Sequence, residues 1–203
     1  MSKKLTVGIF LFDEVEVLDF AGPFEVFSVA SEVHDFSLFD VFTFAKHKAP
    51  VTAVNGLSVN PDYDMHSAPP IDVFIMPGGN GTRKLIEDQE VTDRFEELYA
   101  TSQFTMTVCS GVRLPGITGM LDYRAFCTHM GVYEHMAELA PDALPKPELR
   151  YVQSSDKLYT SGGISAGIDL SFHILGKIYG PSVVEKTAQY MEYKVTDDTA
   201  NIV

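Results

Sequence analysis

Residues 104–116 read FTMTVCSGVRLPG, and this stretch indicates how the whole chain is built. The apolar run before Cys109 is typical of a buried β-strand, and the small residues Ser110 and Gly111 predict an abrupt turn into a helix. At such a turn the sulfur would face the free N–H groups of the helix start, which would favour its thiolate form. We therefore predict that Cys109 is a nucleophile at a strand-to-helix elbow. The alternative is an unreactive thiol buried in the core.

Outward from this elbow, the chain alternates between strand and helix patterns. Strands are predicted at residues 5–12, 36–45, 71–76, 104–108 and 125–128. Helices are predicted at residues 24–30, 83–88, 91–102, 130–139, 164–178 and 182–193. Turn signals predict small hairpins at residues 53–62 and 149–160, and a proline-rich loop at 141–147. This order predicts an α/β fold, a three-layer αβα sandwich with a mainly parallel central sheet of the flavodoxin type. Because no linker or repeat interrupts it, we expect a single domain over residues 1–203.

Composition narrows the possible functions. The net charge of −13 disfavours nucleic acid as a partner, because an acidic surface repels phosphate backbones. No apolar run is long enough to span a membrane, and acidic residues interrupt the only stretch resembling a leader. We therefore expect a cytoplasmic protein with no membrane partner. Two cysteines make no disulfide framework, and the six histidines show no ligand spacing, so no metal site is expected.

Three segments of special composition follow predicted strands. The first contains Asp19, the second is the run PGGNG at residues 77–81, and the third is the Cys109 elbow. In an open parallel sheet, ligand sites form where loops leave the carboxyl ends of the strands. We therefore expect these three segments to converge on one pocket.

The motifs in these segments resemble a known family. They are LDFAGPFEVF at residues 18–27, DVFIMPGG at 72–79, VCSG at 108–111 and GGISAGID at 162–169. Together they look like the ThiJ/PfpI family, within the class I glutamine amidotransferase-like fold, from about residue 5 to about residue 193. The combination of the first motif with a Cys-Ser-Gly elbow is most similar to isocyanide hydratases. It also resembles the sensing domains of AraC-type transcriptional regulators.

The resemblance gives Asp19 a catalytic role beside the nucleophile. In the hydratases the matching acid is thought to position water and to move protons. A carboxyl close to a thiolate should have its pKa raised by like-charge repulsion, so that it could donate a hydrogen bond to the sulfur. The alternative is that Asp19 is the N-cap of the helix that follows it.

Glycine-rich backbone on either side of the elbow is predicted to shape the pocket. The amides of Gly78 and Gly79, with that of Ser110, would form an anion hole; the alternative is a simple tight turn. The Ser110 hydroxyl could also bind substrate, as the matching residue does in the hydratases. The run at residues 162–167 lacks the lysine of a phosphate loop and instead predicts close helix packing, with Ile164 as a possible pocket wall.

His129 is the best histidine candidate for a base, but its context favours a structural role in the pocket, with Asp169 as a possible partner. Protease-like members of the family place a histidine directly after the nucleophile, where this chain has Ser110. Arg113 and Met130 depart from the hydratase pattern and could reshape the pocket. Cys127 is expected to be a buried core thiol.

The function implied by the resemblance is isocyanide hydration. Cys109 would attack the terminal carbon to give a thioimidate, and Asp19 would direct water and protons until a formamide is released. No cofactor is needed, and a small-molecule substrate and a homodimer are expected. The alternatives are a ligand- or redox-sensing protein, or another cysteine-dependent activity such as glyoxalase or amidase. The sequence ends at Val203 without the roughly 100 residues of a DNA-binding region, so we do not expect a complete regulator.

Overall fold

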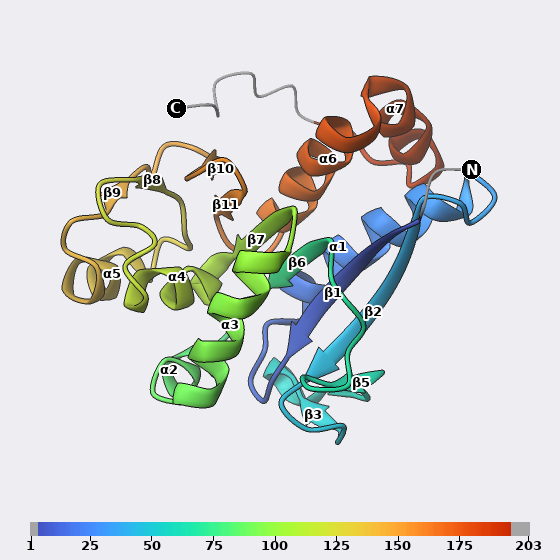
Figure 1. Cartoon of the computed structure of the whole chain (residues 1–203). Coiled ribbons are helices and arrows are strands. Elements are labelled where there is room, and N and C mark those ends of the chain that lie inside the picture. Colours follow the sequence, from blue (N-terminus) through green and yellow to red (C-terminus); the bar gives the residue numbers. More distant parts are fainter. Residues whose placement is uncertain (1–3, 196–203) are drawn as a thin grey trace.

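The computed structural model describes residues 4–195. The central sheet has seven strands, and helices lie on either side of it (Figure 1). The strands lie in the order β10-β11-β7-β6-β1-β2-β5. Their bounds are β1 Leu5–Leu11, β2 Phe39–Ala45, β5 Tyr63–Asp64, β6 Val73–Met76, β7 Phe104–Val108, β10 Tyr151–Gln153 and β11 Leu158–Ser161. All neighbouring strands of this sheet run parallel except β10 and β11. The predicted three-layer α/β architecture with a mainly parallel sheet is confirmed.

Helices cover both faces of the sheet (Figure 1). On one side α1 packs against α6 and α7. On the other side the amphipathic α3 buries its apolar residues, and its Phe95 ring meets Phe74 of β6 at 5.6 Å. The bounds are α1 Val17–Glu32, α2 Thr82–Leu85, α3 Gln89–Thr101, α4 Arg113–Ile117, α5 Tyr133–Leu139, α6 Ala166–Tyr179 and α7 Pro181–Tyr190. Within residues 4–195, no helix combines the length and the apolar character that crossing a bilayer requires.

Several predicted boundaries shift where the backbone turns left-handed. The strand predicted from residue 36 begins at Phe39, because Asp35 and Phe36 have φ angles of 56° and 55°. The helix predicted from residue 164 begins at Ala166, because Ile164 has φ 57°. Extended or helical structure therefore starts only after these residues.

Both predicted hairpins are present, but their strands have different bounds from those predicted. β3 (Val51–Thr52) pairs antiparallel with β4 (Ser58–Val59) around the short 3-10 turn Val54–Gly56. The second hairpin is formed by β10 and β11. The predicted loop at 141–147 contains β9 (Leu144–Pro145), which pairs with β8 (Ala125–Phe126) in a small separate sheet. This pairing joins residues 18 or more apart in sequence, so local composition does not reveal it.

The sheet order places the candidate site. β7, β6 and β1 are consecutive in the sheet and parallel, so their carboxyl ends lie next to one another. The segments that leave them carry Cys109, Gly78 and Asp19 respectively. The strands themselves are buried, with Ile9, Ile75 and Met106 fully covered. A rigid apolar core thus supports three converging loops.

Candidate active site

Cys109 occupies a sharp turn between β7 and the short 3-10 turn Cys109–Val112 that leads into α4. Its φ of 56° is left-handed, a conformation that costs a non-glycine residue on the order of 1–3 kcal/mol. Two hydrogen bonds hold it there. The Cys109 N–H donates to Gly162 O at 3.2 Å, and the Thr128 hydroxyl donates to Cys109 O at 2.7 Å. The elbow predicted from the sequence is present.

Asp19 lies in the first turn of α1 and is fully buried. Its Oδ2 accepts a hydrogen bond from Gly78 N at 3.0 Å, and its Oδ1 accepts one from Ile164 N at 2.9 Å. The N-cap of α1 is Glu16, so the alternative interpretation of Asp19 as a helix cap is wrong. Backbone amides from two distant loops instead fix the orientation of this carboxyl group.

The carboxyl of Asp19 and the thiol of Cys109 face each other across the backbone of Gly78. A Cβ atom on Gly78 would lie 2.8 Å from Asp19 Oδ2 and also 2.8 Å from Cys109 Cβ. The two side chains hydrogen-bond to each other, and this bond favours the proton on sulfur and the charge on the carboxylate. Glycine at position 78 is therefore a requirement for their close approach.

Burial raises the pKa of Asp19 from 3.8 to about 7, against the opposing effect of its backbone hydrogen bonds. The direction predicted from the sequence is right, but desolvation is the first cause, and the like charge that contributes is that of Glu16. A carboxyl group with a pKa near 7 can both accept and donate a proton at neutral pH.

The pKa of Cys109 is raised to about 12, first by burial and then by the negative charge of Asp19. The expectation of a thiolate stabilised by the elbow is therefore wrong. The Ser110 N–H does act in the expected direction, but burial and Asp19 outweigh it. The resting sulfur is therefore a thiol, and the carboxyl group of Asp19 lies beside it.

The expected anion hole is only partly available. Gly78 N–H is bonded to Asp19, and Gly79 N–H donates to Ser110 Oγ at 2.8 Å. Ser110 Oγ also donates to Gly79 O at 3.0 Å, so this hydroxyl fastens the loop. Gly79 has φ 131°, and a Cβ there would lie 2.2 Å from Glu14 O, so the alternative of a tight glycine turn holds. Of the three amides, that of Ser110 is directed at the sulfur.

A pocket of about 290 Å³ opens above the thiol. It is lined by Glu16, Val54, Gly79, Asn80, Arg83, Cys109, Ser110, Arg113, His129, Gly131, Val132 and Ile164. Five predicted site residues are in this lining, while Asp19 and Gly78 lie beneath it. Asn80 belongs to the glycine turn that was predicted to meet the pocket. Five other lining residues were not predicted from the sequence: Glu16, Val54, Arg83, Gly131 and Val132.

His129 lines the pocket with its Nδ1 accepting a hydrogen bond from Gly131 N at 3.1 Å. The predicted pairing of Asp169 with His129 is wrong. Asp169 instead binds Arg150 and accepts a hydrogen bond from Tyr193 Oη at 2.8 Å. His129 is therefore oriented by the backbone of its own loop.

The two departures from the hydratase pattern have different outcomes. Met130 is 86% exposed and does not line the pocket, so it does not reshape it. Arg113 does line the pocket, although its side chain is almost fully buried. Cys127 is a core thiol as expected, with its sulfur bonded to Lys146 O and Leu149 O at 3.3 Å each. In the part of the chain that the structure describes, no group of three His, Cys, Asp or Glu side chains is placed to hold a metal ion.

A mainly parallel α/β sheet with a buried cysteine at a strand-to-helix elbow and a carboxyl group beside it defines the structural class of the chain. The chain belongs to the DJ-1/PfpI family, which matches residues 5–177. This confirms the family expected from the sequence motifs.

Relatives in the family differ in what they do. Isonitrile hydratase from Pseudomonas putida is 30% identical over 189 residues, which cover 93% of this chain and 78% of that protein. The HTH-type transcriptional regulator GbdR from Pseudomonas aeruginosa is 24% identical over 190 residues, which cover 93% of the chain and 51% of the regulator. The chain thus spans about half the length of the regulator.

Among solved structures, a THiJ/PfpI family protein from Pseudomonas syringae matches with a TM-score of 0.83 and 23% identity. The match covers 96% of this chain and 77% of that one. At this identity the likeness bears on the fold alone.

Proposed function

We propose that this protein is a cysteine-dependent hydratase that converts an isocyanide and water into an N-substituted formamide. The observation that carries the proposal is the buried pair of Asp19 and Cys109, an acid with a pKa of about 7 hydrogen-bonded to a thiol beneath a small pocket. The similarity to the Pseudomonas putida isonitrile hydratase supports it. The pocket volume of about 290 Å³ suits a small molecule.

In the first step, the Cys109 sulfur forms a bond to the terminal carbon of the isocyanide. Asp19 accepts the thiol proton and passes it to that same carbon, so the product is a thioimidate, R–N=CH–S–Cys109. The proton leaves sulfur only as the C–S bond forms, so the raised pKa of Cys109 does not prevent attack. The Ser110 amide stabilises the charge that develops on sulfur.

In the second step, water adds to the carbon of the thioimidate. Asp19 accepts a proton from the attacking water, and the nitrogen takes up a proton, giving R–NH–CH(OH)–S–Cys109. Collapse of this adduct breaks the C–S bond, forms the formamide carbonyl and returns a proton to sulfur through Asp19. One water is consumed, and the resting pair is restored.

A second candidate function is ligand sensing without turnover, which the similarity to the regulator GbdR favours. Redox sensing is less well supported. Oxidation of cysteine proceeds through the thiolate, and burial raises the pKa of Cys109 to about 12. In the sensing case the pocket would bind the same kind of small molecule, but no thioimidate would form.

The test is turnover of an aryl isocyanide to its formamide, followed by absorbance, for wild type, Cys109→Ala and Cys127→Ala. We expect Cys109→Ala to fall to the uncatalysed rate. Cys127→Ala should retain turnover, because Cys127 lies outside the pocket lining. Rapid quenching followed by mass spectrometry should show wild-type protein carrying the mass of one intact isocyanide on Cys109. A wild type that binds but never converts isocyanides would overturn the hydratase proposal in favour of sensing.

A further inference from the structure

Arg113 is a buried cation in the wall of the pocket. Its side chain is 3% exposed, and within residues 4–195 no carboxylate forms an ion pair with it. Its Nε donates to His135 Nδ1 at 2.9 Å, and its Nη1 donates to Thr82 Oγ1 at 2.7 Å. Both partners are neutral acceptors when His135 is unprotonated. A guanidinium removed from water without a counter-ion is costly, so its retention in a pocket wall points to an anion that binds there.

The surroundings of Arg113 add positive charge. Arg83 is exposed, lines the same pocket, and forms no ion pair within the described residues. Burial and then the charge of Arg83 lower the pKa of Arg113. Burial followed by the charges of Arg113 and Arg83 lowers the pKa of His135. His135 is thus kept neutral, and the two guanidinium groups repel each other across this side of the pocket.

The pocket lining also contains one carboxylate. Glu16 is the carboxylate in the lining, and it raises the pKa of both Asp19 and Cys109. The charged group that acts on Arg113 is instead the guanidinium of Arg83, which lines the same pocket. The pocket lining therefore combines one carboxylate, which acts on Asp19 and Cys109, with the two arginines.

Arg113 is also close to the nucleophile. It is four residues after Cys109 in the elbow turn, about one helical turn along the chain, and both residues line the pocket. A small ligand can therefore touch both. Arginine presents a planar fork of donors that matches the two oxygens of a carboxylate.

We infer that the ligand of this pocket carries a carboxylate, which Arg113 and Arg83 bind while the other end of the ligand lies against Cys109. Combined with the proposed function, on which this part rests, the substrate class is a small isocyanide with an acidic group. The anion site itself is independent of that chemistry, because it would serve a sensed carboxylate equally well.

Binding of two matched product analogues tests the anion site without turnover. The probes are 4-formamidobenzoate and the neutral 4-formamidobenzamide, which have nearly the same shape, measured by calorimetry. We expect wild type to bind the carboxylate at least tenfold more tightly. Arg113→Met should abolish this preference, and Arg113→Lys should keep part of it. The control variant Arg124→Gln removes an exposed arginine outside the pocket lining and should leave the preference unchanged.

Arg83→Gln covers the case in which Arg113→Met does not fold, because Arg83 is exposed. It should reduce the preference severalfold. Equal binding of the two probes by wild type, or an unchanged preference in both arginine variants, would overturn the inference. If Arg113 had only a structural role, Arg113→Met would weaken the binding of both probes equally.

Turnover of 4-isocyanobenzoate and 4-isocyanobenzamide separates this inference from the proposed function. If the carboxylate analogue binds through Arg113 but neither isocyanide is hydrated, the anion site stands and the hydratase proposal fails. If both isocyanides are hydrated with equal kcat/KM and both analogues bind equally, the hydratase proposal stands and the anion site fails. If the hydratase proposal and the anion site are both correct, kcat/KM is higher for 4-isocyanobenzoate than for 4-isocyanobenzamide, and this difference is lost in Arg113→Met.

Discussion

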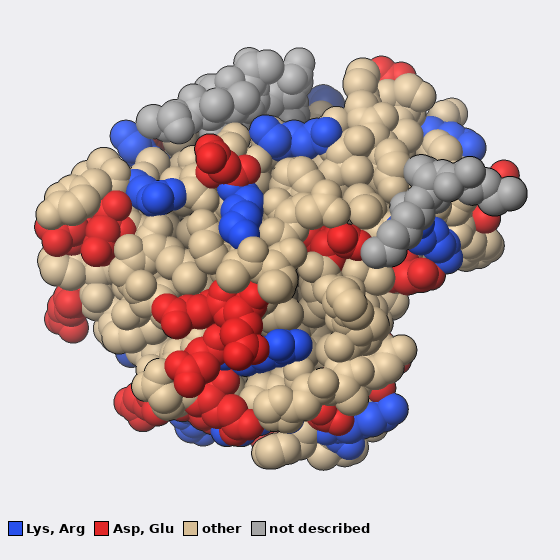
Figure 2. All heavy atoms as spheres, in the orientation of Figure 1, with Lys and Arg blue, Asp and Glu red and all other residues tan. Residues whose placement is uncertain are grey.

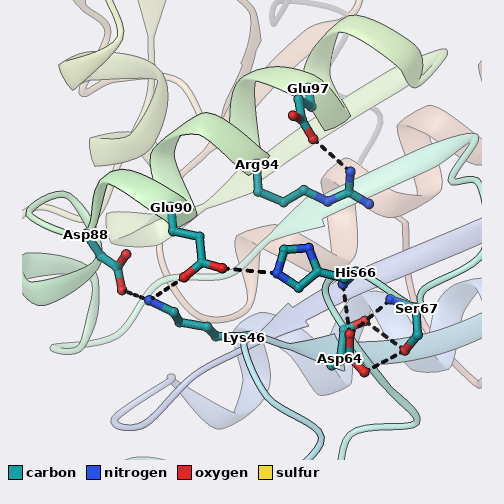
Figure 3. Close-up of polar contacts among 8 residues, drawn as sticks. All are labelled: Lys46, Asp64, His66, Ser67, Asp88, Glu90, Arg94 and Glu97. Carbon is teal, nitrogen blue, oxygen red and sulfur yellow. Dashed lines mark hydrogen bonds and ion pairs between the residues drawn. The ribbon is translucent and has the colours of Figure 1, made fainter.

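The ion pairs around α3 and the buried pair of Asp19 and Cys109 both contain carboxyl groups, but only the carboxyl groups around α3 are exposed to solvent. Figure 3 shows Lys46 between Asp88 and Glu90, with His66 on the other oxygen of Glu90. Lys46 Nζ is 2.5 Å from Asp88 Oδ2 and 3.0 Å from Glu90 Oε2, and His66 Nε2 is 3.0 Å from Glu90 Oε1. Acidic side chains also gather on the surface around α3 in Figure 2. Beneath the pocket, Asp19 forms no ion pair with any of residues 4–195 and accepts two amide hydrogen bonds instead.

The pKa values of these two regions shift in opposite directions. Hydrogen bonds from Lys46 lower the pKa of Asp88 and of Glu90. Desolvation of these two carboxyl groups acts in the opposite direction, but its effect is smaller. Asp19 also accepts hydrogen bonds that lower its pKa, but its burial raises the pKa by more. Desolvation therefore decides whether a carboxyl group serves as a permanent anion or as a base near neutral pH.

Replacing one carboxyl group in each region should give the largest contrast. Asp19→Asn removes the proposed proton carrier, and we expect kcat to fall by about 10²- to 10⁴-fold. Asp88→Asn removes an anion on the surface and should leave kcat unchanged. The measurement is steady-state hydration of an aryl isocyanide by both variants. Full activity in Asp19→Asn, with the fold intact by circular dichroism, would contradict the assigned role.

Separating the acid from the thiol should have the next largest effect. In Gly78→Ala the new methyl group would lie 2.5 Å from Ser110 N and 2.8 Å from both Asp19 Oδ2 and Cys109 Cβ, so the pair must move apart. Displacement of reacting groups by about 1 Å can cost about 10²-fold in rate. The matched control is Gly162→Ala, whose Cβ would meet its neighbours at 3.5 Å or more. Comparable kcat/KM values for these two variants would show that the spacing is not critical.

The sequence was sufficient to predict the central strands of the sheet and the meeting of its loops. It missed the edge strand β5, and the strand predicted at residues 125–128 forms β8 of a separate small sheet instead. Apolar runs such as residues 5–12 have the length and composition of buried strands, and parallel strands bring their carboxyl ends together whatever loops follow. That is why Cys109, Asp19 and the glycine turn were brought together correctly. The edges of elements were less predictable, because left-handed residues such as Asp35 and Ile164 carry no composition signal.

Electrostatic details of the site were not predictable from spacing alone. The elbow geometry suggested a thiolate, but the depth of Cys109 and the charge of Asp19 reverse the sign of the pKa shift. Whether a backbone amide is free to bind an anion depends on which side chain it already contacts. The Gly79 N–H, for example, donates its hydrogen bond to Ser110 Oγ. Asp169 similarly forms an ion pair with Arg150, whose position depends on the packing of β10 beside α6. Such contacts join residues far apart in sequence, so only the folded chain determines them.

The variants Asp19→Asn and Asp88→Asn should also differ in how the free energy of unfolding depends on pH. This effect is smaller than the effects on kcat and kcat/KM. Because the pKa of Asp19 is raised from 3.8 to about 7, the folded state binds this proton more tightly than the unfolded state does. The resulting stabilisation is complete below pH 4 and is lost as the pH rises to about 7. Three pKa units correspond to about 4 kcal/mol, so the free energy of unfolding of wild type should fall relative to Asp19→Asn by up to this order.

Asp88 should show the reverse dependence, because the hydrogen bond from Lys46 lowers its pKa. Its stabilisation is present at neutral pH and is lost only as the pH falls below 4, and solvent screening keeps it small. Urea unfolding at intervals from pH 3 to pH 8 would measure both differences against wild type. If Asp19→Asn and wild type kept a constant difference from pH 4 to pH 8, Asp19 would titrate like a surface carboxyl group. It could not then be the neutral-pH base on which the proposed hydration depends.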